Sequence, residues 1–196
     1  MRTNQLLSVK ILLIFLLPTA LHSEEVMYDG GRFRLSVPSG FAVQPVLEYE
    51  GEGVSTHVFI RPSERKLASI IQVSIFPPNP DIRLETADKI RRACVVGLEQ
   101  HFSSLKRGRL NFSHSDPEDI DIDGVPGVKS TWIAVYKSPQ PAPELPEKGL
   151  FYVVADERGF LTVRVAGDER NFSSITQAAA QAIEMMTIEK PADSSR

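Results

Sequence analysis

Cysteine is almost absent from this sequence: Cys94 is the only one among 196 residues. A lone cysteine cannot close an internal disulfide, which excludes the small scaffolds that are held together by disulfide bonds. The hydrophobic fraction of 42% is ordinary for a globular protein, which excludes a disordered or collagen-like chain. We therefore expect a folded protein whose stability comes from a hydrophobic core.

An excess of positive charge is also missing. The chain has 22 Lys and Arg residues against 25 Asp and Glu residues, and its formal net charge is −3. Nucleic acids and anionic membranes attract basic proteins through long-range fields, and a mildly acidic protein is repelled by both. The composition therefore predicts no nucleic-acid partner. Binding of a basic partner is electrostatically more favourable.

No hydrophobic run is long enough for a polytopic membrane protein. The apolar run of residues 11–17 ends at Pro18, whereas a spanning helix needs about 20 apolar residues. Basic residues precede this run and Ser23 follows it, which is the layout of a signal peptide. We expect residues 1–23 to be cleaved, leaving residues 24–196 as a periplasmic or secreted protein with no integral membrane span. Cleavage removes Arg2 and Lys10 and lowers the net charge by two.

Alternation of apolar and polar residues predicts several strands. Phe33, Leu35 and Val37 alternate with polar residues, and residues 54–61 and 68–76 form a predicted hairpin. Further strands are expected around residues 41–43, 109–113 and 127–137. Residues 150–155 and 160–166 flank a short turn that ends in Gly159, which predicts a second hairpin.

Two segments have helical spacing instead. The apolar residues of the first recur every three or four positions from Leu84 to Phe102, and those of the second from Phe172 to Met186, with Asn171 as the expected N-cap. Cys94 lies on the apolar stripe of the first helix, where we expect a buried thiol without catalytic or redox function. The order of strands, helix, strands and helix predicts a single α+β domain with an antiparallel sheet and two main helices.

Three groups of residues also resemble a known superfamily. Residues 33–41 read FRLSVPSGF, residues 122–127 read IDGVPG before a strand, and a closing hairpin leads to a helix with Phe172 and Ile175. Together they are similar to the PsbP/Mog1/DcrB-like superfamily over nearly the whole mature chain. The resemblance implies an α/β/α sandwich and a non-catalytic role, as an accessory subunit, envelope protein or binding partner. Many DcrB-like members are lipoproteins, but no cysteine near residue 23 offers a lipid acceptor here.

The segment from Asp119 to Gly124 matches the opening of a calcium-binding loop, with Asp119, Asp121 and Asp123 as candidate metal ligands. The rest of that pattern fails, because Ser130 stands where a bidentate glutamate is required. Solvated carboxylates on a strand edge or in a turn fit the segment equally well. We therefore predict no metal site and no cofactor.

Catalytic signatures are missing as well. The histidines that would remain after cleavage, His57, His101 and His114, are not spaced as paired metal ligands. The sequence contains no G-x-S-x-G elbow, no P-loop and no dinucleotide-binding glycine pattern. We therefore expect a protein that is not an enzyme and assign no catalytic residue.

A proline-rich segment of residues 138–149 separates two predicted strands. Pro139, Pro141, Pro143 and Pro146 should hold it stiff and extended. Loops of this length are often functional, and the alternative is a tolerated surface insertion. On the strand before it, Trp132 and Tyr136 share one face, which we expect to belong to the core.

These observations predict an exported, non-catalytic binding or accessory protein that acts through protein–protein interaction. The predicted partner is another protein of the envelope or secreted fraction, and an immunity-type inhibitor belongs to the same class. Two alternatives stay open: a periplasmic protein that binds a small ligand or Ca²⁺, and a hydrolase without a recognisable motif. The residues that would bind a ligand are unknown from the sequence.

Overall fold

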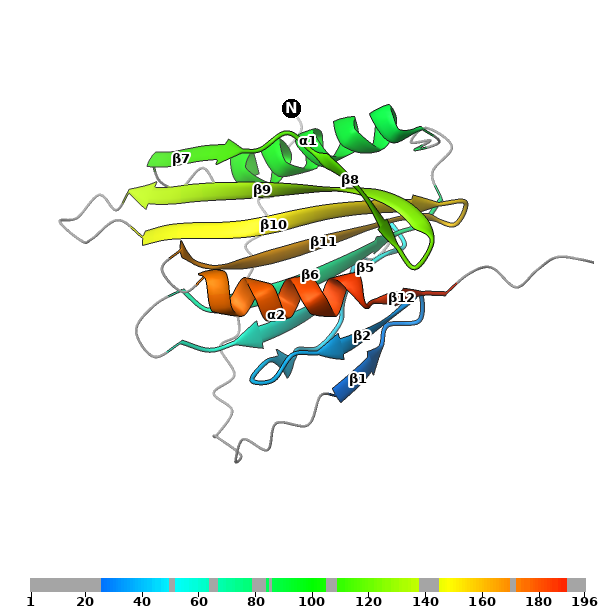
Figure 1. Ribbon diagram of the computed structural model, residues 1–196, viewed down its shortest axis with the longest axis horizontal. Helices are drawn as coiled ribbons and strands as arrows, with labels where there is room; N and C mark the ends of the chain where they lie inside the picture. The colour runs from blue at the N-terminus through cyan, green and yellow to red at the C-terminus, as the bar shows by residue number, and fades with distance from the viewer. Residues whose placement is uncertain are drawn as a thin grey trace, which may run out of the picture.

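The computed structural model describes residues 26–49, 52–63, 67–78, 84, 86–104, 109–137, 145–169 and 172–189. The predicted signal peptide lies outside these residues. The described chain is α+β, as predicted, with a large antiparallel sheet, a small sheet and two helices (Figure 1). No helix in the described ranges is long and apolar enough to cross a membrane.

The large sheet has nine described strands in the order β3-β5-β6-β11-β10-β9-β7, with β4 also paired to β5 and β8 to β9. Neighbouring strands run antiparallel. The strands are β3 (Ala42–Val43), β4 (Leu47–Tyr49), β5 (Val54–Arg61), β6 (Ser69–Phe76), β7 (Arg109–His114), β8 (Glu118–Ile122), β9 (Val125–Lys137), β10 (Leu145–Asp156) and β11 (Gly159–Asp168). Both predicted hairpins are present, as β5–β6 and β10–β11, and Gly159 in the second has a φ of 112°.

The small sheet joins segments that are distant in sequence. It consists of β1 (Val26–Asp29), β2 (Phe33–Val37) and β12 (Thr187–Ile188), in the order β1-β2-β12. Strands β1, β4 and β12 were not predicted, because each has only two to four residues and so carries little alternation of its own. For the segment of β8, a strand edge was one of the two alternatives given by the sequence.

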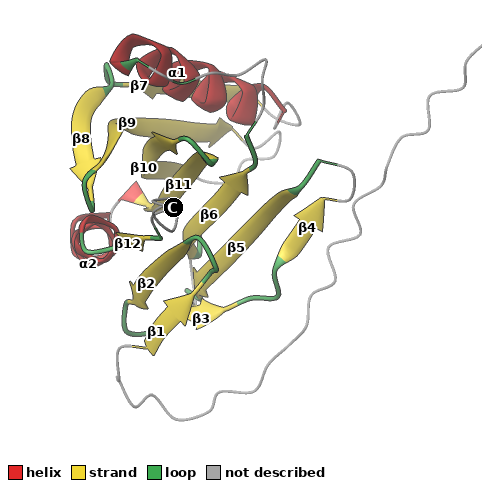
Figure 2. Cartoon of the chain, turned by 90° about the vertical axis from the view of Figure 1, so that its right-hand side faces the viewer, coloured by secondary structure: helices red, strands yellow, loops and turns green. Residues whose placement is uncertain are grey.

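The two helices cover opposite faces of the large sheet (Figure 2). Helix α1 (Ala87–Ser104) packs on β9 and β10, and α2 (Phe172–Glu184) packs on β11, β10 and β2. Helix α1 begins three residues after the predicted Leu84, because Thr86 acts as its cap: the backbone N–H of Lys89 donates to Thr86 Oγ1 at 3.4 Å. The predicted cap of α2, Asn171, lies outside the described residues.

Each face of the large sheet has its own hydrophobic core. Between the large sheet, the small sheet and α2, the core includes Phe33, Leu35, Ile71 and Ile183. Beneath α1 a second core contains the helix side chains Ile90, Cys94, Leu98 and Phe102, together with Trp132 from β9 and Phe151 from β10. Trp132 is thus a core residue, as predicted, and the side chain of Tyr136 lies outside the described part.

The proline-rich connection is shorter than the predicted residues 138–149. Strand β10 begins at Leu145, and Gly149 pairs with Trp132 on β9 and with Ala166 on β11. The sequence pattern is misleading here because Pro146, Glu147 and Gly149 interrupt any apolar alternation, although this stretch lies in the middle of the sheet. The carboxylate of Glu147 is buried against Arg164, which explains a charged residue in this position. Residues 138–144 lie outside the description.

Candidate functional site

A groove of about 1010 Å³ runs between α1 and the large sheet. Its floor consists of side chains from neighbouring strands that point to the α1 face, because residues opposite each other in an antiparallel pair share a face. On β6 and β11 these pairs are Phe76 with Phe160, Ser74 with Thr162, and Gln72 with Arg164. Phe151 and Val153 of β10 complete the floor.

The wall of the groove is one side of α1. Residues Lys89, Arg92, Ala93, Val96, Gly97, Gln100 and His101 line it. Ala93 and Gly97 are one turn apart, so two small residues follow each other along the wall. A Cβ atom at position 97 would lie 3.3 Å from the Phe151 ring, so the glycine lets the helix approach β10 closely.

One end of the groove is apolar. The rings of Phe76 and Phe160 stack there, with 4.4 Å between centroids and 8° between planes. Leu84, just before α1, also lines the groove, and Leu84 and Phe160 each pack against the edge of the core beneath the helix. This end therefore offers a flat aromatic surface to an apolar group.

The other end is polar and is organised around Arg164. Its Nη2 donates to Glu147 Oε1 at 3.3 Å, and its guanidinium carbon lies 5.6 Å from the centroid of the Trp132 ring. Its Nε is buried and has no hydrogen-bond partner among the described residues. Gln72, Gln100 and His101 line the groove at the same end. This end of the groove is therefore lined by polar side chains next to a buried ion pair.

The charges around the groove are of one sign. Lys89, Arg92 and Arg164 are its basic lining residues, and no carboxylate lines it within the described ranges. Arg164 is paired with the carboxylate of Glu147. Burial, with a smaller effect of Arg164, lowers the pKa of His101 to about 4, so this imidazole is neutral at neutral pH.

The depressed pKa of His101 predicts a loss of stability in acid. The unfolded chain takes up the proton near pH 6.5 and the folded chain only near pH 4, so protonation favours unfolding between these values. Allowing for partial exposure, we expect His101 to remove about 2 kcal/mol of unfolding free energy across this range. Burial lowers the pKa of His57 as well and acts in the same direction.

Urea unfolding at pH 7 and pH 4.5 measures this effect, with His101→Gln as the comparison. The loss of stability on acidification should be smaller in the variant, while titration of His57 and of the carboxylates contributes to both proteins. An equal loss in the two proteins would contradict the assignment to His101.

The histidines are not brought together. His57 on β5 lies between the two sheets, where Tyr28 Oη and His57 Nδ1 are 2.8 Å apart. His101 lies on the groove wall, and His114 Nδ1 on β7 is 2.9 Å from the carbonyl oxygen of Ser115. Within the described part of the chain, no group of three histidine, cysteine or acidic residues is placed to hold a metal ion.

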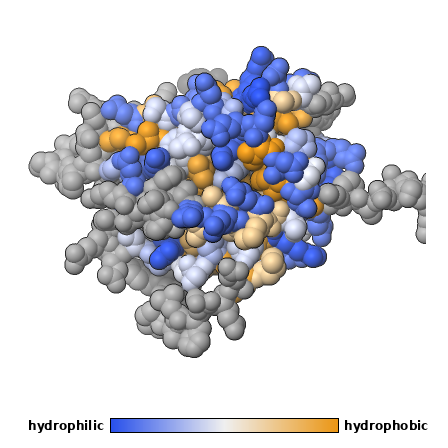
Figure 3. Space-filling model, in the orientation of Figure 1, coloured by the Kyte–Doolittle hydropathy of each residue, from blue (hydrophilic) through white to orange (hydrophobic). Residues whose placement is uncertain are grey.

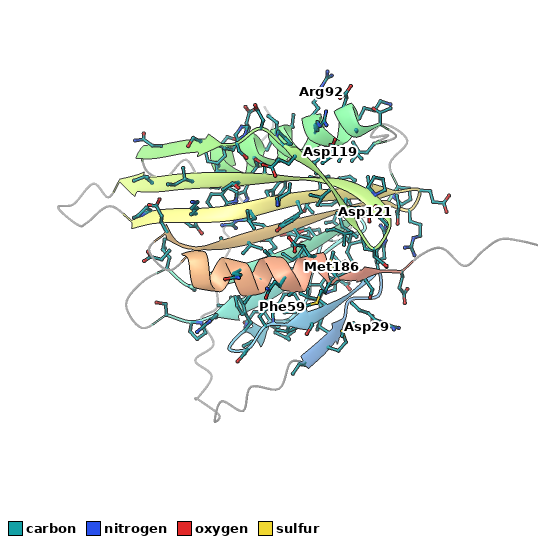
Figure 4. The ribbon with its side chains drawn as sticks, in the orientation of Figure 1. Asp29, Phe59, Arg92, Asp119, Asp121 and Met186 are labelled. Carbon is teal, nitrogen blue, oxygen red and sulfur yellow. The ribbon has the colours of Figure 1, made fainter. Side chains whose placement is uncertain are left out.

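The three candidate aspartates belong to the β8–β9 hairpin, and Figure 4 labels two of them, Asp119 and Asp121. Asp119 forms an ion pair with Arg91 of α1, and Asp121 Oδ1 accepts a hydrogen bond from the Gly124 N–H at 2.7 Å. Asp123 has a φ of 55° and Gly124 one of 76°, which are values of a two-residue hairpin turn of the Asp-Gly kind. Asp123 Oδ2 also accepts a hydrogen bond from the Ile188 N–H of β12 at 3.0 Å. Each carboxylate thus has a partner in the protein.

Cys94 is fully buried beneath α1. Burial raises the pKa of its thiol to about 12, so the group stays protonated at neutral pH. It is a small core residue, as its place on the apolar stripe predicts.

Sequence reasoning missed the groove. The strands that carry Gln72, Ser74, Thr162 and Arg164 were predicted, but nothing in the sequence shows that β6 and β11 are neighbours. A usable signal was the pair Ala93 and Gly97, because two small residues one turn apart make a hollow on a helix.

The opposite face of the molecule, on the α2 side, faces the viewer in Figure 3. Hydrophilic residues cover much of its described surface, and hydrophobic residues gather in separate small areas.

No model of a known protein family matches the chain, and no curated protein matches it. Among solved structures, the cyanobacterial PsbP protein (CyanoP) of Synechocystis sp. PCC 6803 is similar with a TM-score of 0.64 and 13% identity, over 84% of this chain and 92% of that one. LpqN of Mycobacterium tuberculosis, described as involved in cell envelope biogenesis, is similar with a TM-score of 0.52 and 15% identity, over 86% of this chain and 92% of that one. At such identities the likeness shows the fold alone, and this chain has the PsbP-like α+β fold that its strand and turn motifs predicted.

Proposed function

We propose that the mature protein is an exported, non-catalytic binding protein that holds a small, mainly apolar ligand in the groove between α1 and the sheet. The groove itself carries this proposal. Sites for small molecules are concave, mostly apolar, of roughly 300–1,000 Å³, and contain a few well-placed polar groups. The groove has about 1010 Å³, an aromatic end and one polar end. These properties favour a small ligand over a folded protein partner.

The proposal of a non-catalytic role is supported by the hydroxyl groups in the groove. Ser74 Oγ is 2.9 Å from Thr56 Oγ1 and 3.3 Å from Gln72 Nε2. A nucleophilic serine needs a base such as histidine within hydrogen-bond reach, and neither of these partners can accept its proton as a base does. His101, with a pKa of about 4, is a poor base at neutral pH.

Export is supported by the leader-like residues 1–23 and by the resemblance to LpqN. An accessory role in the cell envelope is compatible with that likeness. An envelope protein that carries or senses a small apolar molecule would need a leader and a groove of this kind. It would not need a catalytic centre.

Binding of the neutral apolar dye Nile red to residues 24–196 tests the proposal. We expect saturable binding to one site, because the dye can lie against Phe76 and Phe160. Ala93→Leu should weaken binding about tenfold, because a leucine at the wall fills part of the groove. Ala87→Leu is the matched control, since Ala87 is an exposed residue of the same helix that does not line the groove.

Binding of the dye that does not saturate, or equal affinities of the Ala93→Leu and Ala87→Leu variants, would reject the groove as the binding site. That result would favour a second candidate function, the binding of a protein partner. Strands β3 and β4 form the edge of the large sheet, where Val43, Val46, Leu47 and Tyr49 are 41–52% exposed. Exposed apolar edges are sites where another strand can be added.

A further inference from the structure

His57 lies on the other face of the large sheet from the groove, where it contacts the first described strand of the chain. Thr56 opposes Ser74 of the groove floor, so the next residue of β5 points to the small sheet. We propose that β1 is released in acid: protonation of His57 ends the hydrogen bond from Tyr28 and frees β1 from β2 and from the large sheet. The released protein presents the free edge of β2, where another strand can pair. This inference is independent of what the groove binds.

Strand β1 is weakly held. It is the edge strand of the small sheet, and β2 is the one described strand with which it pairs. Val26 and Met27 are 58% and 65% exposed, and Asp29 is exposed as well. Tyr28 is the residue of β1 that packs against the core between the two sheets. Opening of β1 therefore gives up little buried surface beyond one side chain, which is typical of segments that open locally.

The contact between Tyr28 and His57 joins β1 to the large sheet. Tyr28 Oη lies 2.8 Å from His57 Nδ1, and the ring of Tyr28 also meets that of Phe59 edge-on, with 5.0 Å between centroids. The imidazole is 7% exposed. Its other aromatic neighbour is Phe33 of β2, at 5.2 Å. Of these rings only that of Tyr28 belongs to β1, so release of β1 opens one side of the imidazole to water.

The described charged groups near His57 belong to β1, β2 and β4. Asp29 of β1 forms an exposed ion pair with Arg34 of β2, with 3.4 Å between Oδ2 and Nε. Glu48 of β4 is exposed and opposes Ser55, which lies on the same face of β5 as His57. The residue of β6 opposite His57 is a valine. Burial lowers the pKa of His57 in the presence of these groups, so the carboxylates do not compensate for the lost water.

Protonation of the imidazole also changes the hydrogen bond. Burial, with a smaller effect of Asp29, raises the pKa of Tyr28, so its hydroxyl is protonated at neutral and acid pH and can donate to Nδ1 of a neutral imidazole. An imidazolium carries a proton on both nitrogens. The hydroxyl then loses this acceptor and must turn its own proton elsewhere in a largely buried site, which is unfavourable.

The direction of the pH effect follows from the two states. In the closed form burial holds the pKa of His57 below its ordinary value of 6.5, and release of β1 returns the ring to water. The open form therefore binds a proton more tightly than the closed form. As the pH falls below 6.5, the equilibrium shifts towards the open form, about tenfold for each unit between the two pKa values.

Hydrogen exchange of residues 24–196 at pH 7.5 and pH 5.5 tests the proposal, with each rate divided by that of an unstructured peptide at the same pH. The amides of residues 26–29 and 34–37 should lose protection at pH 5.5, while those of β9 and β10 keep theirs. Unchanged protection of β1 would overturn the proposal. An equal loss in β1, β9 and β10 would also overturn it, because that result indicates unfolding of the whole domain.

Variants assign the effect to His57. His57→Gln should make the protection of β1 equal at the two pH values, whatever its level, because glutamine does not titrate. Tyr28→Phe should increase the opening of β1 at pH 7.5 about fivefold, the effect of losing one hydrogen bond, with the other strands unchanged. His101→Gln and Asp29→Asn are the controls and should keep the pH response. A response that persists in His57→Gln, or disappears in Asp29→Asn, would contradict the role of His57.

Discussion

Gly149→Ala should cost about 3 kcal/mol or more of unfolding free energy, the upper end of what overpacking a core costs. A Cβ atom at this position would lie 2.2 Å from the Val165 backbone oxygen and 2.3 Å from the Trp132 ring. Gly149 pairs with β9 and β11 at once, so neither neighbour can move without breaking a ladder. Urea unfolding followed by the emission of Trp132 measures the loss.

Gly167→Ala is the matched control for this substitution. Gly167 lies on β11 and is buried like Gly149, but a Cβ atom there would meet only the Ser69 side chain, with Oγ at 3.2 Å. A hydroxyl group can rotate away, whereas a backbone carbonyl in a central strand cannot. Unfolding midpoints that are equal for the two alanine variants would show that β10 does not pack as described.

Glu147→Ala should destabilise the protein by about 3–5 kcal/mol, because it leaves the guanidinium of Arg164 buried without its counter-charge. The side chains of Glu147 and Arg164 are 8% and 14% exposed. Removing one partner of a buried pair costs much more than the pair itself contributes, since the desolvation of the remaining charge is no longer offset. Thermal and urea unfolding of the variant at pH 7 measure this loss.

An exposed ion pair provides the comparison for Glu147. Arg34 and Glu189 are 3.9 Å apart, and their side chains are 55% and 49% exposed. Glu189→Ala should change the unfolding free energy by no more than about 0.5 kcal/mol, as is usual for pairs screened by water. If the Glu147 and Glu189 variants lose similar stability, the Glu147–Arg164 pair is not buried and the polar end of the groove is open to water.

Both substitutions concern the segment that the sequence assigned to a proline-rich loop. Residues 145–149 lie between β9 and β11, and they place Glu147 beside Arg164 and Gly149 beneath Trp132. The polar end of the groove therefore depends on residues that the sequence pattern had assigned to a surface connection. This is the largest correction that the structure makes, and its cause is local: charged, glycine and proline residues are usual in loops, and only a buried partner makes a charged residue stable in a central strand.

At Asp123 and Gly124 the structure shows the turn that was one of the alternatives given by the sequence. The Asp-Gly pair was compatible with a turn as well as with a metal loop. In the structure Asp123 and Gly124 form the two-residue connection of a hairpin, and the carboxylate of Asp123 binds the backbone of β12. Local geometry requires positive φ at both positions, which aspartate tolerates and glycine accepts without strain.

The sequence by itself determined the α+β class, both long helices, both long hairpins, the buried state of Cys94 and the superfamily resemblance. These features depend on periodicity and turn chemistry, which act between residues a few positions apart. Only the tertiary structure decided that β6 and β11 are neighbours, that α1 leaves their faces accessible, and that Arg164 lies between Glu147, Trp132 and a groove. Those facts depend on contacts between residues far apart in sequence, and the register of a strand against its neighbour cannot be derived from its own alternation.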